Sequence, residues 1–291
     1  MARQCRTVLL TAFAAVMASA AYAREEHLRL FAMHSCPITR ALLCPTPPIT
    51  PMPLGPFIRL ECPAETDEAT EGREIAIRWR SSPGVAQVRL YYYGTACRLG
   101  TKPRGSFDGF ITQLVPNEGR AVWKVPWMDA LAFRLRIAGF DQSGTRIAEN
   151  ERPVSYRPAT MVDVDATCVV VDRTHQRLYY QRDGRIVRMH IVSTARRGYL
   201  TPPMEPGEHW RGVAVGKVFR KSVRAWSRAY QCPMPFWMAI TSSGSHGIHA
   251  ATPQAHRSLG RPASHGCVRQ TLSDAKALFS LVTVGTAVYV Y

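Results

Sequence analysis

The stretch that decides the fold of this chain is Ser-His-Gly-Cys-Val-Arg at residues 264–269. It follows His-Gly-Ile-His at residues 246–249 after fourteen intervening residues. A cysteine that is close in sequence to several histidines can be a structural thiol, a zinc ligand or a nucleophile that a histidine activates. The charge of the surrounding sequence helps to distinguish these three possibilities.

Acidic residues are absent from the sequence around this box. The interval between Glu208 and Asp274 contains no Asp or Glu. The basic residues of the same interval are Arg211, Lys217, Arg220, Lys221, Arg224, Arg228, Arg257, Arg261 and Arg269. Nearby positive charge stabilises a thiolate and lowers the pKa of a cysteine. We therefore predict a lowered pKa for Cys267, and a cationic surface that attracts an anionic substrate.

The same asymmetry disfavours a zinc hydrolase built from His246, His249 and His265. Such a site usually needs a carboxylate nearby as general base. We therefore expect no metal and no cofactor. The histidine that partners Cys267 must be oriented by a backbone carbonyl or by a carboxylate from elsewhere in the chain, and the sequence leaves both open.

His249, the fourteen-residue gap and the box at residues 264–269 together resemble the signature of the L,D-transpeptidase catalytic domain, the YkuD type. The resemblance covers about residues 165–291. Further similar segments are residues 171–179, 193–194, 201–202, 259–263 and 284–290. The Ser-His-Gly-Cys box is the most specific of these features.

Three departures from the family pattern affect the loops around the box. Ala250 stands where the family usually has Gly after the histidine, and Ala195 replaces the usual Gly after Ser-Thr. The Thr-Pro turn also carries extra residues, 204–207. We expect these departures to change loop geometry more than the reaction.

The resemblance implies a cysteine acyltransferase that acts on peptidoglycan. Cys267 would attack a stem tetrapeptide and release its terminal D-alanine, with His249 as the base. Backbone N–H groups near Gly266 and Cys267 would form the oxyanion hole, and His265 would have a supporting or substrate-contacting role. Carbapenems, which acylate enzymes of this family, would acylate Cys267.

The acyl acceptor stays open. Transfer to a second stem peptide would make a 3–3 cross-link, transfer to water would make the protein an L,D-carboxypeptidase, and transfer to a lysine would attach an envelope protein to the wall. A non-catalytic wall-binding protein on the same scaffold is a further alternative. A thiol-redox role is weaker, because the sequence contains no Cys-x-x-Cys motif.

Four residues are predicted to contact substrate. Arg269 could bind a stem carboxylate through two parallel hydrogen bonds, although a structural salt bridge is nearly as plausible. Ser264 could position His265, and His246 could line the entrance. Trp237 could form an apolar wall for the stem chain, although core packing is the safer assignment for such a residue.

Residues 1–23 have the features of a secretory signal peptide. Arg3 and Arg6 precede an uncharged apolar run at residues 7–21, and Ala-Tyr-Ala at residues 21–23 fits a cleavage site. The run is short for a bilayer span, so a membrane anchor is the weaker reading. We expect export to the periplasm or cell wall without stable membrane insertion.

The net charge of the chain is consistent with an anionic partner. The formal net charge is +16, and removal of the signal peptide takes away two arginines and no acid, leaving +14. Wall polymer, lipid head groups and carboxylate-bearing substrates are suitable partners. Nucleic acid is the rival partner, and the signal peptide argues against it.

The rest of the chain is predicted to be mainly β. Residues 24–56 are a Pro-rich linker. Residues 57–158 alternate apolar and polar side chains with turn residues between them, which predicts an immunoglobulin-like or fibronectin-like β-sandwich that serves as a spacer or wall-binding module. Residues 160–291 form the β-rich L,D-transpeptidase catalytic domain, with one helix at residues 273–281 capped by Ser273.

Seven cysteines would remain after signal cleavage, and an odd number in an oxidising compartment indicates three bridges and one free thiol. The connectivity cannot be deduced from sequence. By proximity the expected pairs, which leave Cys267 free, are Cys36–Cys44, Cys62–Cys97 and Cys168–Cys232.

Overall fold

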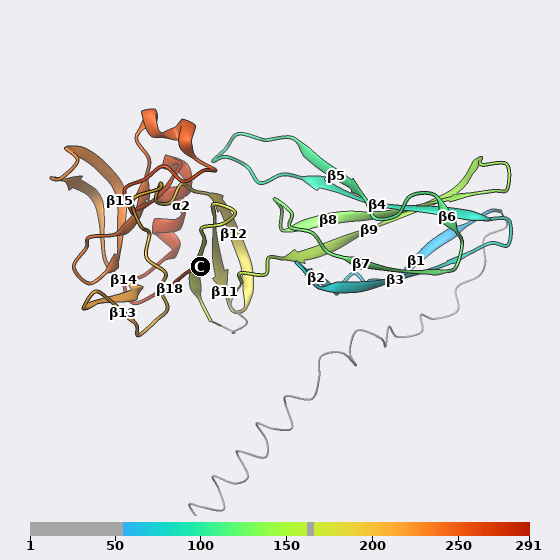
Figure 1. The fold of residues 1–291 in the computed structure, drawn as a ribbon, viewed down its shortest axis with the longest axis horizontal. Helices are drawn as coiled ribbons and strands as arrows, with labels where there is room; N and C mark the ends of the chain where they lie inside the picture. Colours follow the sequence, from blue (N-terminus) through green and yellow to red (C-terminus); the bar gives the residue numbers. More distant parts are fainter. Residues whose placement is uncertain (1–54, 162–165) are drawn as a thin grey trace, which may run out of the picture. The chain divides into compact units, whose positions relative to one another are not determined.

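The computed structural model describes residues 55–161 and 166–291 (Figure 1). These residues are mainly β-strand, as the sequence predicts. Among them, no helix combines the length and the apolar character needed to cross a membrane.

The predicted signal peptide and almost all of the Pro-rich linker lie outside the described residues. So do Cys36 and Cys44, and their expected bridge stays a prediction.

Residues 58–157 form two sheets. The three-stranded sheet has the order β1-β3-β7, and the larger sheet has the order β2-β9-β8-β4-β5 with β6 paired to β4. The strands are β1 (Ile58–Cys62), β2 (Glu68–Thr70), β3 (Glu74–Ser81), β4 (Gln87–Thr95), β5 (Ser106–Phe110), β6 (Val115–Pro116), β7 (Arg120–Lys124), β8 (Ala132–Phe140) and β9 (Arg146–Arg157).

Side chains from both sheets form one hydrophobic core. In β8, Phe133, Leu135 and Ile137 are buried, whereas Arg134 is exposed and Arg136 is half-buried. This is the period-two alternation that the sequence predicts. The first, third and seventh strands form one sheet and the fourth, eighth and ninth strands lie side by side in the other, an order found in immunoglobulin-like sandwiches. On this basis we propose an immunoglobulin-like module at residues 57–158.

The second half of the chain is organised around a nine-stranded sheet of order β12-β11-β10-β18-β14-β15-β16-β17, with β13 paired to β14. Its strands are β10 (Cys168–Asp172), β11 (Arg177–Arg182), β12 (Arg185–Ile191), β13 (His209–Trp210), β14 (Val213–Ser227), β15 (Cys232–Thr241), β16 (Gly247–Ala250), β17 (Val268–Gln270) and β18 (Ala287–Val290). A 3-10 helix, η2 (Pro253–Ser258), lies between β16 and β17, and α2 (Leu272–Leu281) follows β17. One core cluster joins α2 to this sheet.

The helix predicted at residues 273–281 is present, but its N-cap is different. The cap is Thr271, whose hydroxyl oxygen accepts a hydrogen bond from the backbone N–H of Asp274 at 3.1 Å. Ser273 instead lies inside the first turn. Thr271 satisfies an otherwise unpaired N–H group of that turn, and this fixes α2 directly after β17.

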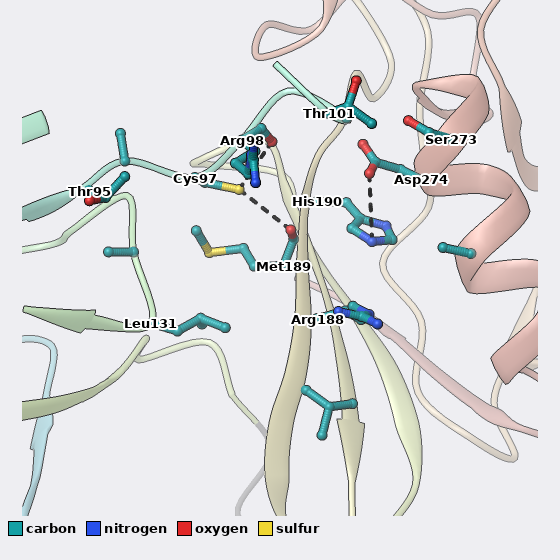
Figure 2. Close-up of a pocket in the computed structure, with 15 residues that line it drawn as sticks. Thr95, Cys97, Arg98, Thr101, Leu131, Arg188, Met189, His190, Ser273 and Asp274 are labelled. Carbon is teal, nitrogen blue, oxygen red and sulfur yellow. Dashed lines mark hydrogen bonds and ion pairs between the residues drawn. The ribbon is translucent and has the colours of Figure 1, made fainter. Parts of the chain in front are cut away.

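Two of the expected disulfides are wrong, because Cys97, Cys168 and Cys232 carry free thiols. Cys97 Sγ faces the backbone carbonyl of Met189 at 3.4 Å, so it is not bridged to Cys62 (Figure 2). Cys168 lies on β10 and Cys232 on β15, and β18 and β14 separate these strands in the sheet. Three strand spacings amount to about 14 Å, about twice the Cα separation that a disulfide tolerates.

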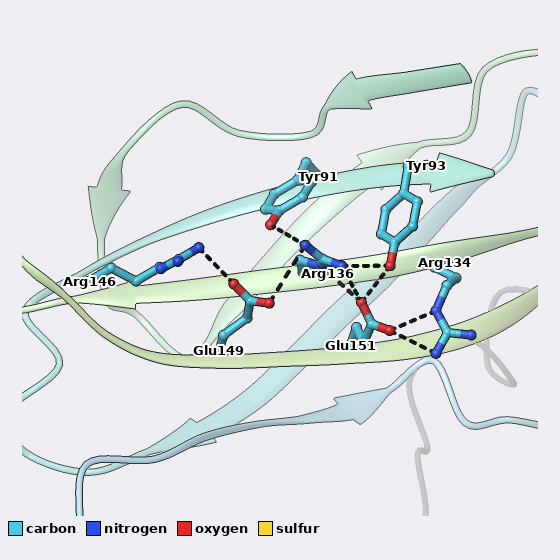
Figure 3. Close-up of polar contacts among 7 residues, drawn as sticks. All are labelled: Tyr91, Tyr93, Arg134, Arg136, Arg146, Glu149 and Glu151. Atoms are coloured by element: carbon cyan, nitrogen blue, oxygen red, sulfur yellow. Dashed lines mark hydrogen bonds and ion pairs between the residues drawn. The ribbon is translucent and has the colours of Figure 1, made fainter. Parts of the chain in front are cut away.

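A charged network lies on the outer face of the larger sandwich sheet (Figure 3). The carboxylate of Glu151 accepts hydrogen bonds from the Tyr93 hydroxyl at 2.5 Å, from Arg136 Nη2 at 2.6 Å and from Arg134 Nε at 2.8 Å. The Tyr93 hydrogen bond and then the two arginines lower the pKa of Glu151 to about 2. The network therefore links β4, β8 and β9.

The lowered pKa predicts how the sandwich responds to acid. A carboxylate with a lowered folded-state pKa stabilises the fold above its unfolded pKa of roughly 4.3, and this contribution is lost as the pH falls through about 2. Because Glu151 is partly exposed, we expect a contribution of about 1 kcal/mol. Glu151→Gln should lower the free energy of unfolding by this amount at pH 7 and by less at pH 2.5, measured by urea denaturation.

The matched control is Glu118→Gln, because Glu118 is exposed on the same module. An equal effect of the two substitutions, or an effect of Glu151→Gln that does not depend on pH, would contradict this role for the network.

Candidate active site

The two halves of the cysteine motif lie on neighbouring strands. Strands β16 and β17 pair in parallel, with Ile248 opposite Val268 and His249 opposite Arg269. Cys267 immediately precedes β17. Because side chains alternate along a strand, Cys267, His249 and Arg269 share one face of this strand pair. The fold therefore brings together the predicted nucleophile, base and carboxylate-binding residue.

His249 is buried and has a fixed orientation. Its Nδ1 lies 2.7 Å from the backbone carbonyl oxygen of Ala250, so Nδ1 carries the proton and donates it to that carbonyl. Nε2 is then left with a lone pair. The backbone carbonyl, and not a carboxylate, is thus the orienting group that the sequence left open. The change from the usual Gly to Ala at position 250 leaves this carbonyl in use.

Burial lowers the pKa of His249 to about 4. The nearby positive charge of Arg269 lowers it further, whereas the hydrogen bond to Ala250 opposes the change. His249 is therefore a neutral imidazole at pH 7, which is the form that can accept a proton.

Cys267 has a free thiol, but its pKa is raised and not lowered. Burial is the main cause, and Cys232 adds to it, while a hydrogen bond from the Gly247 backbone and the charge of Arg269 oppose it. The sequence-based prediction of a lowered pKa is wrong, because burial outweighs the charge of Arg269. Most of the other basic residues in the interval are exposed, and water screens them. At rest the Cys267 thiol and the His249 imidazole are therefore both neutral.

Hydrogen bonds inside the box hold the turn that presents Cys267. The Gly266 N–H donates to Ser264 Oγ at 3.0 Å, and the Gly266 carbonyl accepts from Thr201 Oγ1 at 2.8 Å. Thr201 Oγ1 also accepts from the Ala195 N–H at 3.0 Å. Ser264 is completely buried, so its hydroxyl serves the turn. The Gly266 N–H is therefore engaged and not free for an oxyanion. A donor role for the Cys267 N–H stays a prediction.

Gly266 is required at its position for two reasons. Its φ of +137° lies in the region that favours glycine, and a Cβ added there would come within 2.7 Å of His246 Nε2. His246 is itself fixed, since its Nε2 lies 3.1 Å from the Leu200 carbonyl oxygen and its ring packs edge-on against Trp210. His246 therefore supports the turn, and its predicted contact with substrate stays a prediction.

His265 is held by two tyrosines and an arginine. Its ring stacks on Tyr230 with centroids 4.4 Å apart and meets Tyr199 edge-on at 4.6 Å. Arg196 Nη2 lies 2.9 Å from His265 Nε2, so this nitrogen accepts a hydrogen bond and Nδ1 carries the proton. Burial, Arg196 and Arg269 lower the pKa of His265. A supporting or substrate-contacting role for His265 stays a prediction.

Trp237 is buried at 7% exposure, and its ring centroid lies 5.7 Å from that of His249. A Cβ on Gly247 would come within 2.5 Å of the Trp237 ring, so the strand packs directly on the indole. Packing around His249 is thus the role that the structure gives Trp237. A contact with substrate stays a prediction.

Sequence reasoning missed several residues that shape the site. Arg196, Tyr199 and Tyr230 surround His265, and they come from segments far from the box in sequence. None of them belongs to a motif, so nothing in the pattern marks them. Thr201 belongs to the Thr-Pro turn that resembles the family pattern, but the sequence gives no sign of its hydrogen bond to the Gly266 carbonyl.

The sequence of residues 166–290 matches the family model of the YkuD L,D-transpeptidase catalytic domain. This part of the chain is an L,D-transpeptidase catalytic domain. The match lies within the domain predicted at residues 160–291. Comparison with curated proteins found no match.

Solved structures similar to this chain include several L,D-transpeptidases. One from Stackebrandtia nassauensis is 30% identical, with a TM-score of 0.36, over 43% of this chain and 55% of that protein. The chain thus spans about half the length of that relative. The catalytic domain of the E. faecium L,D-transpeptidase is 25% identical over 45% of this chain and all of that domain, with a TM-score of 0.36. An L,D-transpeptidase from Mycobacterium smegmatis is 14% identical over 81% of this chain and 99% of that protein, with a TM-score of 0.37.

The raised pKa of Cys267 predicts its reactivity. Iodoacetamide attacks the thiolate, so alkylation of Cys267 should be slow at pH 7 and should rise until the pH exceeds 9. Arg269→Gln removes a charge that stabilises the thiolate, and should slow alkylation further by roughly two- to tenfold. Peptide mass spectrometry separates this cysteine from the other thiols.

Arg257→Gln is the matched control, because Arg257 is exposed on η2. A plateau in the alkylation rate below pH 7 would show instead that Cys267 is a thiolate at rest.

Proposed function

We propose that this protein is a peptidoglycan L,D-transpeptidase that works through a thioester on Cys267. The observation that supports this best is the arrangement of the pair: a free thiol shares a strand face with His249, whose Nδ1 is bonded to the Ala250 carbonyl. This arrangement occurs inside an L,D-transpeptidase catalytic domain. A nucleophile, a base and a group that orients the base are what acyl transfer requires.

In the first half-reaction, Cys267 Sγ attacks the carbonyl of the third residue of a stem tetrapeptide. His249 Nε2 takes the thiol proton during the attack, because neither group is charged at rest. The C–N bond to the terminal D-alanine then breaks, and the imidazolium gives its proton to the leaving amine. The products are free D-alanine and a thioester on Cys267.

In the second half-reaction, an acceptor amine attacks the thioester carbonyl. The amine loses a proton to His249 Nε2, the C–S bond breaks, and the sulfur leaves as a thiolate that regains the proton from the imidazolium. A new amide forms between the third residues of two stems. The neutral resting state is thus restored.

The charges of the site support a carboxylate-bearing substrate. Arg269 lies opposite His249, and its charge acts on Cys267, His249 and His265. The guanidinium of Arg269 is therefore close enough to bind a stem carboxylate beside the reacting carbonyl. Arg196, which lies 2.9 Å from His265 Nε2, is a second positive group next to the site.

The base and the nucleophile can be tested separately. Incubation with a carbapenem should add one inhibitor mass to the intact protein, mapped to Cys267, and Cys267→Ala should abolish this adduct. His249→Gln should slow acylation by about 10²- to 10⁴-fold while the fold is retained. The control His256→Gln changes the same residue type on η2 and should have no such effect.

Absence of an adduct on folded wild-type protein would count against the nucleophile. Normal acylation of His249→Gln would count against the base.

The acceptor is tested by analysis of the products from disaccharide tetrapeptides. We expect a 3–3 linked dimer together with released D-alanine. Tripeptide alone would show that water is the acceptor. Attachment of the stem to a lysine of an added envelope protein would show protein anchoring.

A further inference from the structure

A second polar site lies away from the catalytic cysteine, in a cavity of about 440 Å³ (Figure 2). Its lining comes from the end of β4 and the loop that follows it, within residues 95–101, with Ala130 and Leu131. The rest comes from β12 and from α2. Cys267 and His249 are not part of this lining. The cavity is therefore distinct from the proposed active site.

Asp274 gives this cavity an unusual chemistry. The residue is only 9% exposed, and its Oδ2 makes no hydrogen bond with any described residue. Its Oδ1 lies 3.9 Å from His190 Nε2, which is too far for a hydrogen bond. A buried carboxylate without a donor is costly, because the charge loses water and gains no partner.

His190 cannot supply the missing donor. Its Nδ1 lies 2.9 Å from the side-chain oxygen of Gln270, so Nδ1 carries the proton and donates it there. Burial lowers the pKa of His190, so the imidazole is neutral and Nε2 presents a lone pair. The cavity wall thus holds two acceptors, Asp274 and His190 Nε2, that face each other without a donor.

The groups around these acceptors define the rest of the site. Ser273 and Thr101 lie beside Asp274, as Figure 2 shows, and each adds a hydroxyl. Arg98 and Arg188 are exposed side chains of the same lining. A ligand that suits this site therefore carries a donor-rich cation at the buried end and carboxylate groups at the arginine end. Among the described residues no cluster of three or more His, Cys, Asp or Glu could hold a metal ion.

We propose that this cavity is a second binding site for an ammonium-bearing, carboxylate-bearing peptide, with Asp274 and His190 receiving the ammonium group and Arg98 and Arg188 the carboxylates. A primary ammonium has three N–H donors, enough for both acceptors and a hydroxyl. This assignment rests on the proposed function, because a stem peptide with a diamino acid carries these groups. The volume of the cavity exceeds the needs of a single amino acid, which favours the peptide over free diaminopimelate.

Several contacts next to the cavity join the sandwich residues 100–129 to the second half of the chain. Asp129 accepts hydrogen bonds from Arg177 Nε at 2.7 Å and from Arg104. The ring of Trp127 stacks on His175 with centroids 4.6 Å apart. Gly100 packs against α2, because a Cβ there would come within 2.7 Å of Ser273 Oγ. The sandwich therefore supplies part of the binding site and is more than a spacer.

Calorimetric titration of the full chain with stem tetrapeptide tests the proposal. In a Cys267→Ala background no thioester can form, and we expect two binding events, one at the catalytic face and one in the cavity. Asp274→Asn should weaken one event by roughly 10- to 100-fold and leave the other unchanged. Free diaminopimelate should bind the cavity more weakly than the peptide does.

The control Asp183→Asn makes the same change in an exposed turn and should retain both events. Arg188→Gln alters the exposed end of the cavity, so it tests the site independently of any effect of Asp274→Asn on folding. It should weaken the same event. Acetylation of the side-chain amine of the peptide should abolish the cavity event.

A single binding event in the parent protein would overturn the proposal. So would an unchanged titration of Asp274→Asn and Arg188→Gln, or full binding of the acetylated peptide. Because the nucleophile is absent from these variants, failure here leaves the thioester chemistry untouched. Conversely, failure of carbapenems to acylate the protein would count against the proposed function. The two binding events could still be measured in that case, so the two failures are distinguishable.

Discussion

The hydrogen bond from His249 Nδ1 to the Ala250 carbonyl is the constraint on which the active site depends. It fixes the tautomer, and with it the nitrogen that can accept a proton. A carboxylate in the same place would favour the imidazolium, whereas a carbonyl stabilises it far less. Together with burial, this choice keeps His249 neutral at rest. The base is therefore ready without a salt bridge to position it.

Because Cys267 and His249 are both neutral at rest, positive groups of the site act on a charge that forms only during the reaction. In papain-like enzymes the cysteine is already a thiolate, paired with a charged histidine, before substrate binds. In this protein the burial of Cys267 disfavours such an ion pair. In the proposed mechanism, charge develops only as the thiol gives up its proton to His249. The charge of Arg269 acts on the pKa values of both groups. In the proposed mechanism it therefore stabilises the developing thiolate and can hold a substrate carboxylate.

The sequence predicted the strands well and the electrostatics poorly. The alternation along β8 and the Ser-His-Gly-Cys box are local patterns. Such patterns depend only on residues close in sequence, so they can be predicted before the tertiary structure is known. The pKa of Cys267 depends on burial, which no spacing reveals, and the many nearby arginines proved to be mostly solvated. The same limit applies to the expected Cys168–Cys232 bridge, because strand order in the sheet decides which cysteines meet. The contacts of Tyr230 and Arg196 with His265 likewise depend on tertiary structure.

The protonated state of Cys267 also bears on its resistance to oxidation. Oxidants and foreign disulfides react with the thiolate, so a half-buried thiol with a raised pKa is converted slowly to sulfenic acid or to a mixed disulfide. Such a thiol stays unreactive toward oxidants until its proton is removed. Slow oxidation and the proton transfer of the proposed mechanism thus both follow from one feature, the burial that raises the pKa of the sulfur.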